Sequence, residues 1–144
     1  MPALEWSVEE SPADADVERL VEGVTSHGRA RARSDARPIA CFVRSDGEVV
    51  AGACGRTELT RLFISYLWVE ESRRGRGLGS KLLQQLEASA IARGCTDGLI
   101  ETLLDEVANL YLRRGYLPLA IIPNFVGSFT RHILLKPFSA PSRD

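Results

Sequence analysis

The sequence is poor in the residues that build disulfide frameworks and metal sites, with 3 cysteines and 2 histidines among 144 residues. The cysteines Cys41, Cys54 and Cys95 are odd in number and lack metal-ligand spacing. We therefore expect no disulfide framework, no metal, and a reducing compartment such as the cytoplasm. A nucleophilic cysteine would need a partner histidine, and we expect His27 and His132 to lie far from strand-end loops. We interpret the cysteines as small buried hydrophobic residues.

Long apolar runs and an excess of one charge are absent too. No apolar run is long enough to cross a bilayer, and the first residues lack the order of a signal peptide, so we expect neither. The formal net charge of −1 favours neither nucleic acid nor a membrane as partner. A basic cluster at residues 27–33 has no interleaved aromatic residues and is interpreted as a solvated helix end and loop. Length and a 44% hydrophobic composition predict a single domain, residues 1–144.

The most informative segment is residues 67–80, where an apolar strand pattern ends, three glycines follow, and a helix pattern begins at once. The start of a helix leaves backbone N–H groups without partners and carries partial positive charge. The alternate glycines from Gly75 to Gly79 let this backbone approach a ligand closely. Three arginines between residues 73 and 76 add full positive charge. The segment therefore predicts a site for a phosphate or diphosphate group.

Two common phosphate-binding motifs fit this segment less well. Residues 75–80 approach the dinucleotide fingerprint G-x-G-x-x-G, with Ser80 in the last position and Glu101 near the place of its acid. Three apolar runs precede the glycines, however, and only about 40 residues follow Glu101, too few to complete a doubly wound sheet. The P-loop pattern fails because no Gly-Lys-Ser/Thr follows at the right spacing.

Periodicity predicts the elements around this segment. We expect a strand at residues 4–8, an amphipathic helix at 12–28 with Ser11 as its cap and Gly28 at its end, and an irregular loop at 29–37. The later strands are expected at residues 39–44, 49–57, 60–69, 98–103, 116–122 and 130–136. Helices are expected at residues 79–93, with Leu82, Leu83, Leu86 and Ala90 on the buried face, and 105–114. Pro123, Asn124 and Gly127 are assigned to the loop before the last strand.

These elements predict an α/β fold with a mixed sheet. Tight turns, such as the one at residues 45–48, make the first long strands antiparallel. The strand–helix–strand passage from Val69 to Gly98 requires a parallel pair at the centre of the sheet. We expect helices on both faces.

The segment from Arg74 to Gly79 matches R/Q-x-x-G-x-G/A, the signature of the GNAT superfamily of acetyl-CoA-dependent N-acetyltransferases, which this chain resembles. Residues 110–116 resemble the family's Y-x-x-x-G-F/Y segment. Further similarity is found at residues 64–69 and 88–95, and residues 122–127 and 134–138 resemble a stand-alone bacterial subgroup. Residues 105–107 depart from the subgroup's aromatic-Gln-Ala stretch, so the contacts of that stretch are not carried over.

This resemblance implies a GNAT-like fold in which two parallel strands splay apart, and the pantetheine arm of acetyl-CoA fills the wedge between them. The backbone groups of Leu67 and Val69 would pair with pantetheine. The diphosphate would be held by Arg74, Gly75, Arg76, Gly77, Leu78, Gly79 and Ser80.

Acetyl transfer from a thioester to an amine needs a proton acceptor for the amine and a donor for the leaving thiolate. Tyr111 matches the family's tyrosine four residues before Gly115 and is the candidate acid; its ordinary pKa of about 10 lies roughly 1.5 units above that of a thiol. Glu70, which leaves the strand before the phosphate loop, is the candidate base, with Glu101 on the neighbouring strand as the alternative. By family analogy, the Val69 N–H is the candidate oxyanion donor.

The sequence thus predicts an enzyme that moves an acetyl group from acetyl-CoA to a primary amine by direct transfer in a ternary complex. One alternative is a non-catalytic acyl-CoA-binding or regulatory domain on the same fold. Another, disfavoured by topology, is a fragment of a nucleotide-binding oxidoreductase. The segments expected around the acceptor, residues 29–37 and 121–131, select no particular amine. Dimers through the last strands are common in the family, so a homodimer is a candidate assembly.

Overall fold

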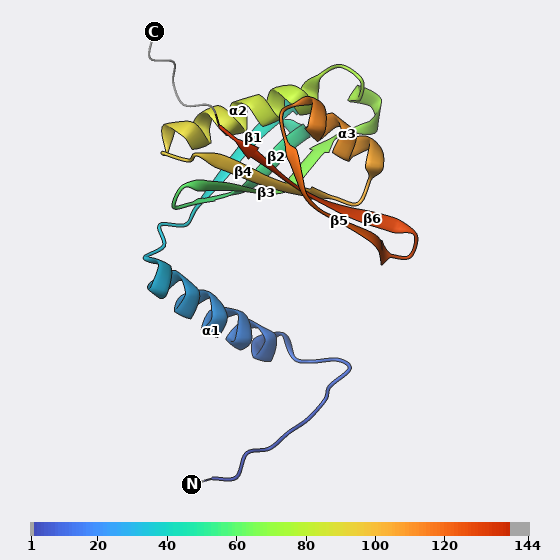
Figure 1. The fold of residues 1–144 in the computed structure, drawn as a ribbon. Coiled ribbons are helices and arrows are strands. Elements are labelled where there is room, and N and C mark those ends of the chain that lie inside the picture. The colour runs from blue at the N-terminus through green and yellow to red at the C-terminus, as the bar shows by residue number, and fades with distance from the viewer. Residues whose placement is uncertain (1, 139–144) are drawn as a thin grey trace. The chain divides into compact units, whose positions relative to one another are not determined.

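The structure is a computed structural model that describes residues 2–138. The chain divides into two compact units, Met1–Ser34 and Asp35–Asp144. The first unit contains the helix α1 (Asp14–Ala32), drawn in blue in Figure 1. The second unit contains the sheet and the helices that pack on it.

The predicted strand at residues 4–8 was wrong, because these residues adopt no regular structure. A strand needs a hydrogen-bonding partner, and no strand pairing within residues 2–138 includes this segment. The alternating apolar side chains that suggested a strand, Leu4, Trp6 and Val8, are at least 84% exposed. Alternation alone therefore did not identify a strand here.

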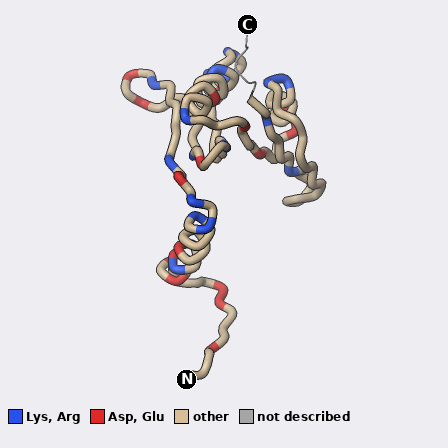
Figure 2. The backbone as a smooth tube through the Cα atoms, turned by 60° about the vertical axis from the view of Figure 1, so that its left-hand side comes forward, with Lys and Arg blue, Asp and Glu red and all other residues tan. Residues whose placement is uncertain are grey.

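The predicted bounds of the first helix were also wrong. α1 begins two residues later than expected, with Ala13 rather than Ser11 at its cap position, and it continues past Gly28 to Ala32. A mid-helix glycine costs only about 1 kcal/mol, and the alanines and arginines that follow are strong helix formers. Figure 2 shows acidic residues near the start of α1 and basic residues near its end, where each favours the helix dipole. The irregular loop is correspondingly shorter, and Arg33, the residue after the helix, adopts a left-handed conformation.

The second unit is built on a six-stranded sheet with the order β1-β2-β3-β4-β6-β5 within the described residues. Its strands are β1 (Arg37–Ser45), β2 (Glu48–Glu58), β3 (Arg61–Val69), β4 (Asp97–Thr102), β5 (Leu117–Val126) and β6 (Phe129–Pro137). The turn between β1 and β2 places Asp46 and Gly47 at positive φ, as a two-residue hairpin turn requires. β3 and β4 form the parallel pair, and every other neighbouring pair is antiparallel. The predicted mixed sheet is confirmed.

The helices α2 (Leu78–Ala92) and α3 (Asp105–Arg113) pack on one face of this sheet, with the short 3-10 helix η1 (Glu71–Arg73) before α2 (Figure 1). The expected helices on both faces are therefore not found in the described part of the second unit, because residues of α2 and α3 share one core. The predicted inner face of α2 is confirmed, since Leu82, Leu83, Leu86 and Ala90 are all buried in the core. The core also contains Ile100 of β4 and Leu134 of β6. Cys95 is buried as expected, and burial raises the pKa of its thiol. Cys41 and Cys54 are only half-buried.

A β-bulge in β3 redirects its side chains. Cys54 of β2 lies opposite Tyr66, whereas Gly55 lies opposite Ile64, so Ser65 is the extra residue on β3. Before the bulge Leu62 and Ile64 face the core, and after it Leu67 and Val69 do. Gly55 is required at this point, because a Cβ there would lie 1.8 Å from the Phe63 carbonyl oxygen. The bulge therefore sets which residues of β3 line the helix-covered face.

β3 and β4 pair over only three positions, from Arg61 opposite Asp97 to Phe63 opposite Leu99. Beyond Phe63, in the part of the chain that the structure describes, the edge of β3 has no β4 partner. A bulge bends its strand, and Ser65 lies two residues after the last β4-paired residue, Phe63. The two parallel strands thus enclose an open wedge, defined here as the space beside residues 64–69 of β3 and 100–102 of β4.

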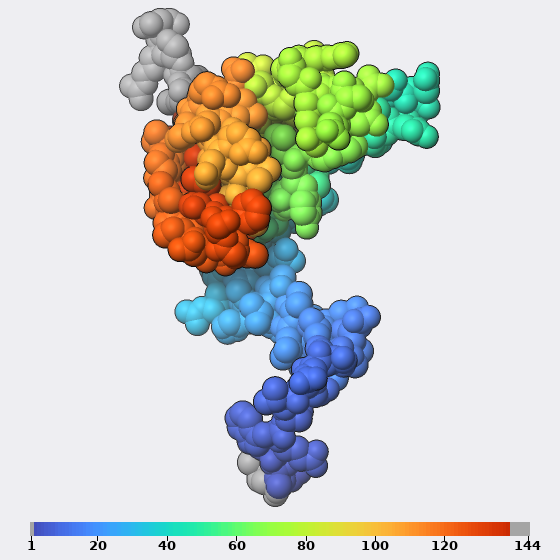
Figure 3. Space-filling view, turned by 90° about the vertical axis from the view of Figure 1, so that its right-hand side faces the viewer, coloured from blue at the N-terminus to red at the C-terminus, as the bar shows by residue number. Residues whose placement is uncertain are grey.

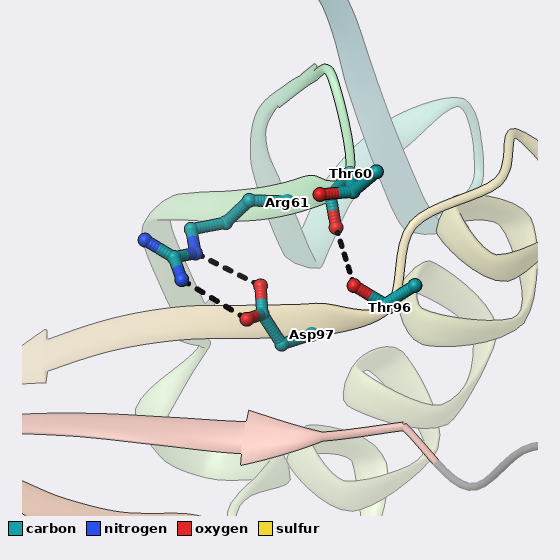
Figure 4. A network of polar contacts seen from close by, with 4 residues as sticks. All are labelled: Thr60, Arg61, Thr96 and Asp97. Carbon is teal, nitrogen blue, oxygen red and sulfur yellow. Dashed lines mark hydrogen bonds and ion pairs between the residues drawn. The ribbon is translucent and has the colours of Figure 1, made fainter.

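Polar contacts hold the closed end of this wedge together (Figure 4). Arg61 donates two hydrogen bonds to the carboxylate of Asp97, at 2.8 and 3.0 Å. The backbone N–H of Thr96 donates to the Thr60 carbonyl at 2.7 Å, and its hydroxyl lies 3.4 Å from the same oxygen. These contacts fix where the strands meet and therefore where the wedge begins.

The last hairpin differs from its prediction. β5 extends through Pro123 and Asn124 to Val126, so these residues belong to the strand and not to the loop. Pairing is irregular between Ile122 and Val126, which accommodates a proline without an N–H and an asparagine at φ 53°. The connecting turn contains Gly127 at positive φ, as one of only two residues between the strands.

Candidate active site

The start of α2 offers unpaired backbone amides. Gly77, at φ 79°, is the N-cap residue, and the first intrahelical bond runs from the Lys81 N–H to the Gly77 carbonyl. The N–H groups of Leu78, Gly79 and Ser80 therefore have no intrahelical acceptor. Within residues 2–138 no side chain caps this helix, and its first turn contains no acid. This terminus is suited to an anion that accepts several hydrogen bonds.

Arginine side chains surround this terminus in two different arrangements. The Nε of Arg74 donates to the Val69 carbonyl at 2.9 Å and so attaches the glycine loop to the end of β3. The Nε of Arg73 lies 3.1 Å from a carboxylate oxygen of Glu70. Arg74 thus shapes the loop, while Arg73 is already partly neutralised by an acid.

The backbone of Leu67 and Val69 faces the wedge. The Glu70 N–H donates to the Val50 carbonyl, which makes Glu70 and Val50 a hydrogen-bonded pair between β3 and β2. Hydrogen-bonded pairs alternate along an antiparallel ladder, so Trp68 also bonds toward β2, whereas Leu67 and Val69 point their polar groups the other way. The bond from Arg74 to the Val69 carbonyl agrees with this direction.

Tyr111 of α3 belongs to the core on the helix-covered face, and its ring lies 5.9 Å from that of Tyr116. Its hydroxyl makes no hydrogen bond to the described residues, yet among these residues no buried side-chain nitrogen or oxygen lacks a partner. The hydroxyl must therefore reach the accessible surface. Burial of the ring raises the pKa of Tyr111 to about 12, so the phenol is neutral at physiological pH.

α3 and the start of α2 meet beside β3. A Cβ built on Gly79 would lie 3.8 Å from Leu67 and 3.9 Å from Leu110, the residue before Tyr111. Figure 3 shows residues of the α3 region, in orange, beside residues of the β3–α2 region, in green. The structure thus brings together Leu67, Gly79 and Leu110, the chain neighbour of Tyr111, from three separate elements.

The two candidate bases occupy different levels of the wedge, on the face away from α2 and α3. Glu70 follows Val69 at the open end and pairs with Arg73. Glu101 precedes the end of β4 and pairs with Arg131 of β6. Continuing the register of Phe63 and Leu99 by two residues brings Ser65 level with Glu101. Glu101 therefore lies at the bulge, while Glu70 lies near the phosphate loop.

Two arrangements at the helix-covered face were missed from the sequence. Glu87 of α2 is 7% exposed, accepts a hydrogen bond from the Tyr116 hydroxyl at 2.8 Å, and lies 2.7 Å from the Lys136 ammonium. His132 lies 2.7 Å from Asp105, at the start of α3. The expectation that His132 lies far from strand-end loops was wrong, because β6 pairs it with Thr102, the last residue of β4. Glu87 occupies a core-facing position in the helix pattern of α2. A charged residue at such a position is the sequence signal that could have revealed this buried pair.

A parallel strand pair that opens beside an uncapped, arginine-flanked helix start is the arrangement that the resemblance to the GNAT superfamily implied. A model of the acetyltransferase (GNAT) family matches residues 3–116, and the chain belongs to this family. The predicted family, fold class and enzyme class are thereby confirmed.

Two relatives of this chain are named acetyltransferases. The chain is 36% identical to blasticidin-S acetyltransferase of Streptomyces morookaense over 109 residues, which cover 71% of this chain and 79% of that protein. It is 33% identical to an acetyltransferase of Agrobacterium fabrum over 107 residues, covering 72% and 78% of the two chains. GNAT family acetyltransferases use acetyl-CoA as the acetyl donor.

Solved structures show the same fold. An acetyltransferase crystal structure from Agrobacterium tumefaciens superposes with a TM-score of 0.88 at 25% identity, covering 94% of this chain and 100% of that one. An acetyltransferase from Bacillus cereus gives a TM-score of 0.78 at 22% identity, covering 92% and 98%. Within residues 2–138, no helix is long and apolar enough to cross a membrane, and no cluster of three His, Cys, Asp or Glu residues could hold a metal ion.

Proposed function

We propose that this enzyme transfers the acetyl group of acetyl-CoA to a primary amine, with both substrates bound at once and residues 1–144 acting as one domain. The observation that carries the proposal is the continuity between the unpaired amides of α2 and the wedge-facing backbone of β3. The family match, which runs across both compact units, supports the single domain.

The cofactor is proposed to bind along the start of α2 and then along the wedge-facing backbone of β3. The diphosphate would accept hydrogen bonds from the backbone of residues 74–80, where the helix dipole adds positive potential. The pantetheine arm would run down β3 as an added strand, pairing with Leu67 and Val69, because their polar groups point into the wedge. The thioester would then lie deeper, toward the bulge at Ser65.

At the thioester, the amine nitrogen forms a bond to the carbonyl carbon, the C–S bond breaks with its electron pair on sulfur, and the ammonium proton leaves to a base. Tyr111 is proposed to donate a hydrogen bond to the leaving thiolate from the helix-covered face. With its pKa near 12, complete proton transfer to a thiolate of pKa about 8.5 would cost roughly 5 kcal/mol. Tyr111 therefore acts by hydrogen bonding to the developing charge more than by giving up its proton.

The base is proposed to act from the opposite face. Glu70 and Glu101 are both candidates, and the register favours Glu101, because it lies level with the bulge where the thioester is placed. Glu70 is held by Arg73 beside the phosphate loop. Acid and base would thus be separated by the sheet, each beside the atom that it serves.

A relative's name supports a small-molecule acceptor. The relative that is 36% identical is a blasticidin-S acetyltransferase, so its printed substrate is a small molecule. We propose an acceptor of that size for this chain, without transferring the compound itself.

Replacement of the two acids tests the assignment of the base. Glu101→Gln is expected to lower kcat/KM for the amine by about a hundredfold, within the usual contribution of a positioned base, whereas Glu70→Gln changes it less than threefold. The measurement is release of free CoA from acetyl-CoA over a panel of small amines. Equal activity of wild type and Glu101→Gln, with loss in Glu70→Gln, would transfer the role to Glu70. No CoA release with any amine, despite binding of acetyl-CoA, would support the non-catalytic alternative.

Replacement of the tyrosines separates chemistry from stability. Tyr111→Phe is expected to lower kcat about tenfold, the value of one hydrogen bond of about 1.4 kcal/mol, with little change in thermal stability. Because a phenol of pKa about 12 is protonated at every lower pH, its ionisation does not shape the rate profile below pH 10. The alkaline limb of kcat should therefore be the same in wild type and variant.

Tyr116→Phe is the matched control, since it removes the hydrogen bond to Glu87 instead. It should lower the melting temperature and leave kcat unchanged. An unchanged kcat in Tyr111→Phe across the pH range would remove this residue from the mechanism.

A further inference from the structure

Arg131 of β6 lies across β4 from the wedge and has two side-chain contacts there. Its guanidinium carbon lies 5.0 Å from the centre of the Phe125 ring, and its Nη2 contacts a carboxylate oxygen of Glu101. The side chain remains 30% exposed. A guanidinium has five N–H donors, so its contact with Glu101 leaves others for a second carboxylate.

Arg131 projects on the same side of the sheet as the proposed base. Side chains alternate along a strand, and Ile100 of β4 and Leu134 of β6 face the core under α2 and α3. Glu101 follows Ile100 directly and Arg131 lies three residues before Leu134, so both side chains face the opposite side of the sheet. Glu101 lies level with the bulge at Ser65, where the proposed function places the thioester, and Arg131 lies two residues along β6 from Ile133, the partner of Glu101.

The charges that change during the reaction indicate a role for Arg131. While Glu101 is ionised, it neutralises Arg131 through their ion pair. When Glu101 takes the proton of the attacking amine it becomes neutral, and Arg131 loses its anion in a partly desolvated place. A carboxylate on the acceptor, beside the amine, would restore the pair, and the fork of an arginine matches a carboxylate in two parallel hydrogen bonds.

We propose that Arg131 binds a carboxylate of the acceptor, so that the preferred substrates are small amines that carry a carboxylate next to the amino group, as amino acids do. This inference rests on the proposed function and specifies its acceptor class. Phe125 contacts the guanidinium through its ring, and Glu101 accepts the proton of the amino group. Because Arg131 and Glu101 are in direct contact, a carboxylate on the carbon beside the amine would lie next to Arg131 when the amine lies at Glu101.

Matched acceptors test the proposal without any variant. We compare an amino acid, its carboxamide and the parent amine without the carboxylate, all with acetyl-CoA. The wild type is expected to prefer the amino acid by at least tenfold in kcat/KM, because a hydrogen bond between charged groups is stronger than one between neutral groups. Equal values for the three acceptors would overturn the proposal.

Variants then locate the preference. Arg131→Met should raise KM about tenfold more for the amino acid than for the parent amine, and Arg131→Lys should retain part of the preference. Arg56→Met is the matched control, because Arg56 also stacks on a phenylalanine ring, 4.1 Å from that of Phe63, and pairs with a glutamate, Glu58. It should keep the full preference. A loss of activity by Arg131→Met that is equal for all three acceptors would mean that the arginine only holds β6 to β4.

A binding measurement distinguishes failure of this inference from failure of the proposed function. Calorimetric titration of the CoA-saturated wild type with the amino acid and with its carboxamide needs no turnover. Tighter binding of the amino acid, lost in Arg131→Met, supports the role of Arg131 even if no acetyl group moves. Turnover of all three acceptors without preference leaves the acetyltransferase proposal standing and overturns this one.

Discussion

Ser80→Asp is expected to weaken CoA binding about a hundredfold while the protein remains folded. The Ser80 N–H is one of the amides at the start of α2 that lack an intrahelical acceptor. An aspartate there would compete for those amides and repel the diphosphate. Hydrogen bonds to charged groups are worth about 1.5–3 kcal/mol each, so loss of one and added repulsion give an effect of this size. Isothermal titration with CoA measures it.

Ser80→Asp should weaken CoA binding but raise the stability of the free protein, and these opposite changes make the test specific. An acid in the first turn interacts favourably with the helix dipole, by about 0.3–1 kcal/mol, and α2 has none there. Ser80→Asp should therefore raise the melting temperature of the free protein slightly, while binding is lost. Ser80→Asn, the neutral control of similar shape, should bind CoA within about threefold of wild type. Unchanged CoA affinity in Ser80→Asp would show that the diphosphate binds elsewhere.

Local patterns predicted the elements that position the cofactor. The glycines and the helix pattern of residues 67–80 located the start of α2 to within a residue, because the turn and the helix face are both encoded by near neighbours. The predicted backbone roles of Leu67 and Val69 are consistent with the structure, since their polar groups face the wedge. That direction follows from strand alternation once the strand is placed.

Features that depend on distant pairing could not be predicted. The bulge at Ser65 is defined only by the register between β2 and β3, although Gly55 is the residue that it requires. The pairing of Glu101 with Arg131 arises because β6 lies beside β4, an order that no local signal contains. The failed strand at residues 4–8 makes the same point, because a strand exists only with its partner.

Lys136→Met is expected to destabilise the protein by about 3 kcal/mol, at the lower end for a broken buried ion pair. Lys136 reaches from β6 to Glu87, whose side chain is 9% exposed, and Glu87 also accepts from the Tyr116 hydroxyl. Loss of the ammonium would leave a buried carboxylate with one neutral donor. The estimate stays at the lower end because the Lys136 side chain is 26% exposed, so water can reach the site. Denaturant unfolding monitored by circular dichroism gives the change.

A double variant distinguishes an unpaired charge from lost packing. Glu87→Gln removes the charge and keeps an oxygen for Tyr116, so Lys136→Met combined with Glu87→Gln should recover more than half of the lost stability. Double-mutant analysis then gives a coupling energy of about 1–3 kcal/mol between the two positions. Additive effects of the two changes would mean that the methylene groups of Lys136, which lie 3.3 Å from a Cβ placed on Gly115, contribute through packing alone.

Because Glu87 belongs to the helix that presents the phosphate-binding amides and Tyr116 follows the helix that carries Tyr111, the coupled pair should also keep the two halves of the active site aligned. Lys136→Met is therefore expected to raise KM for acetyl-CoA. The double variant should lower this KM again, in proportion to the stability that it recovers.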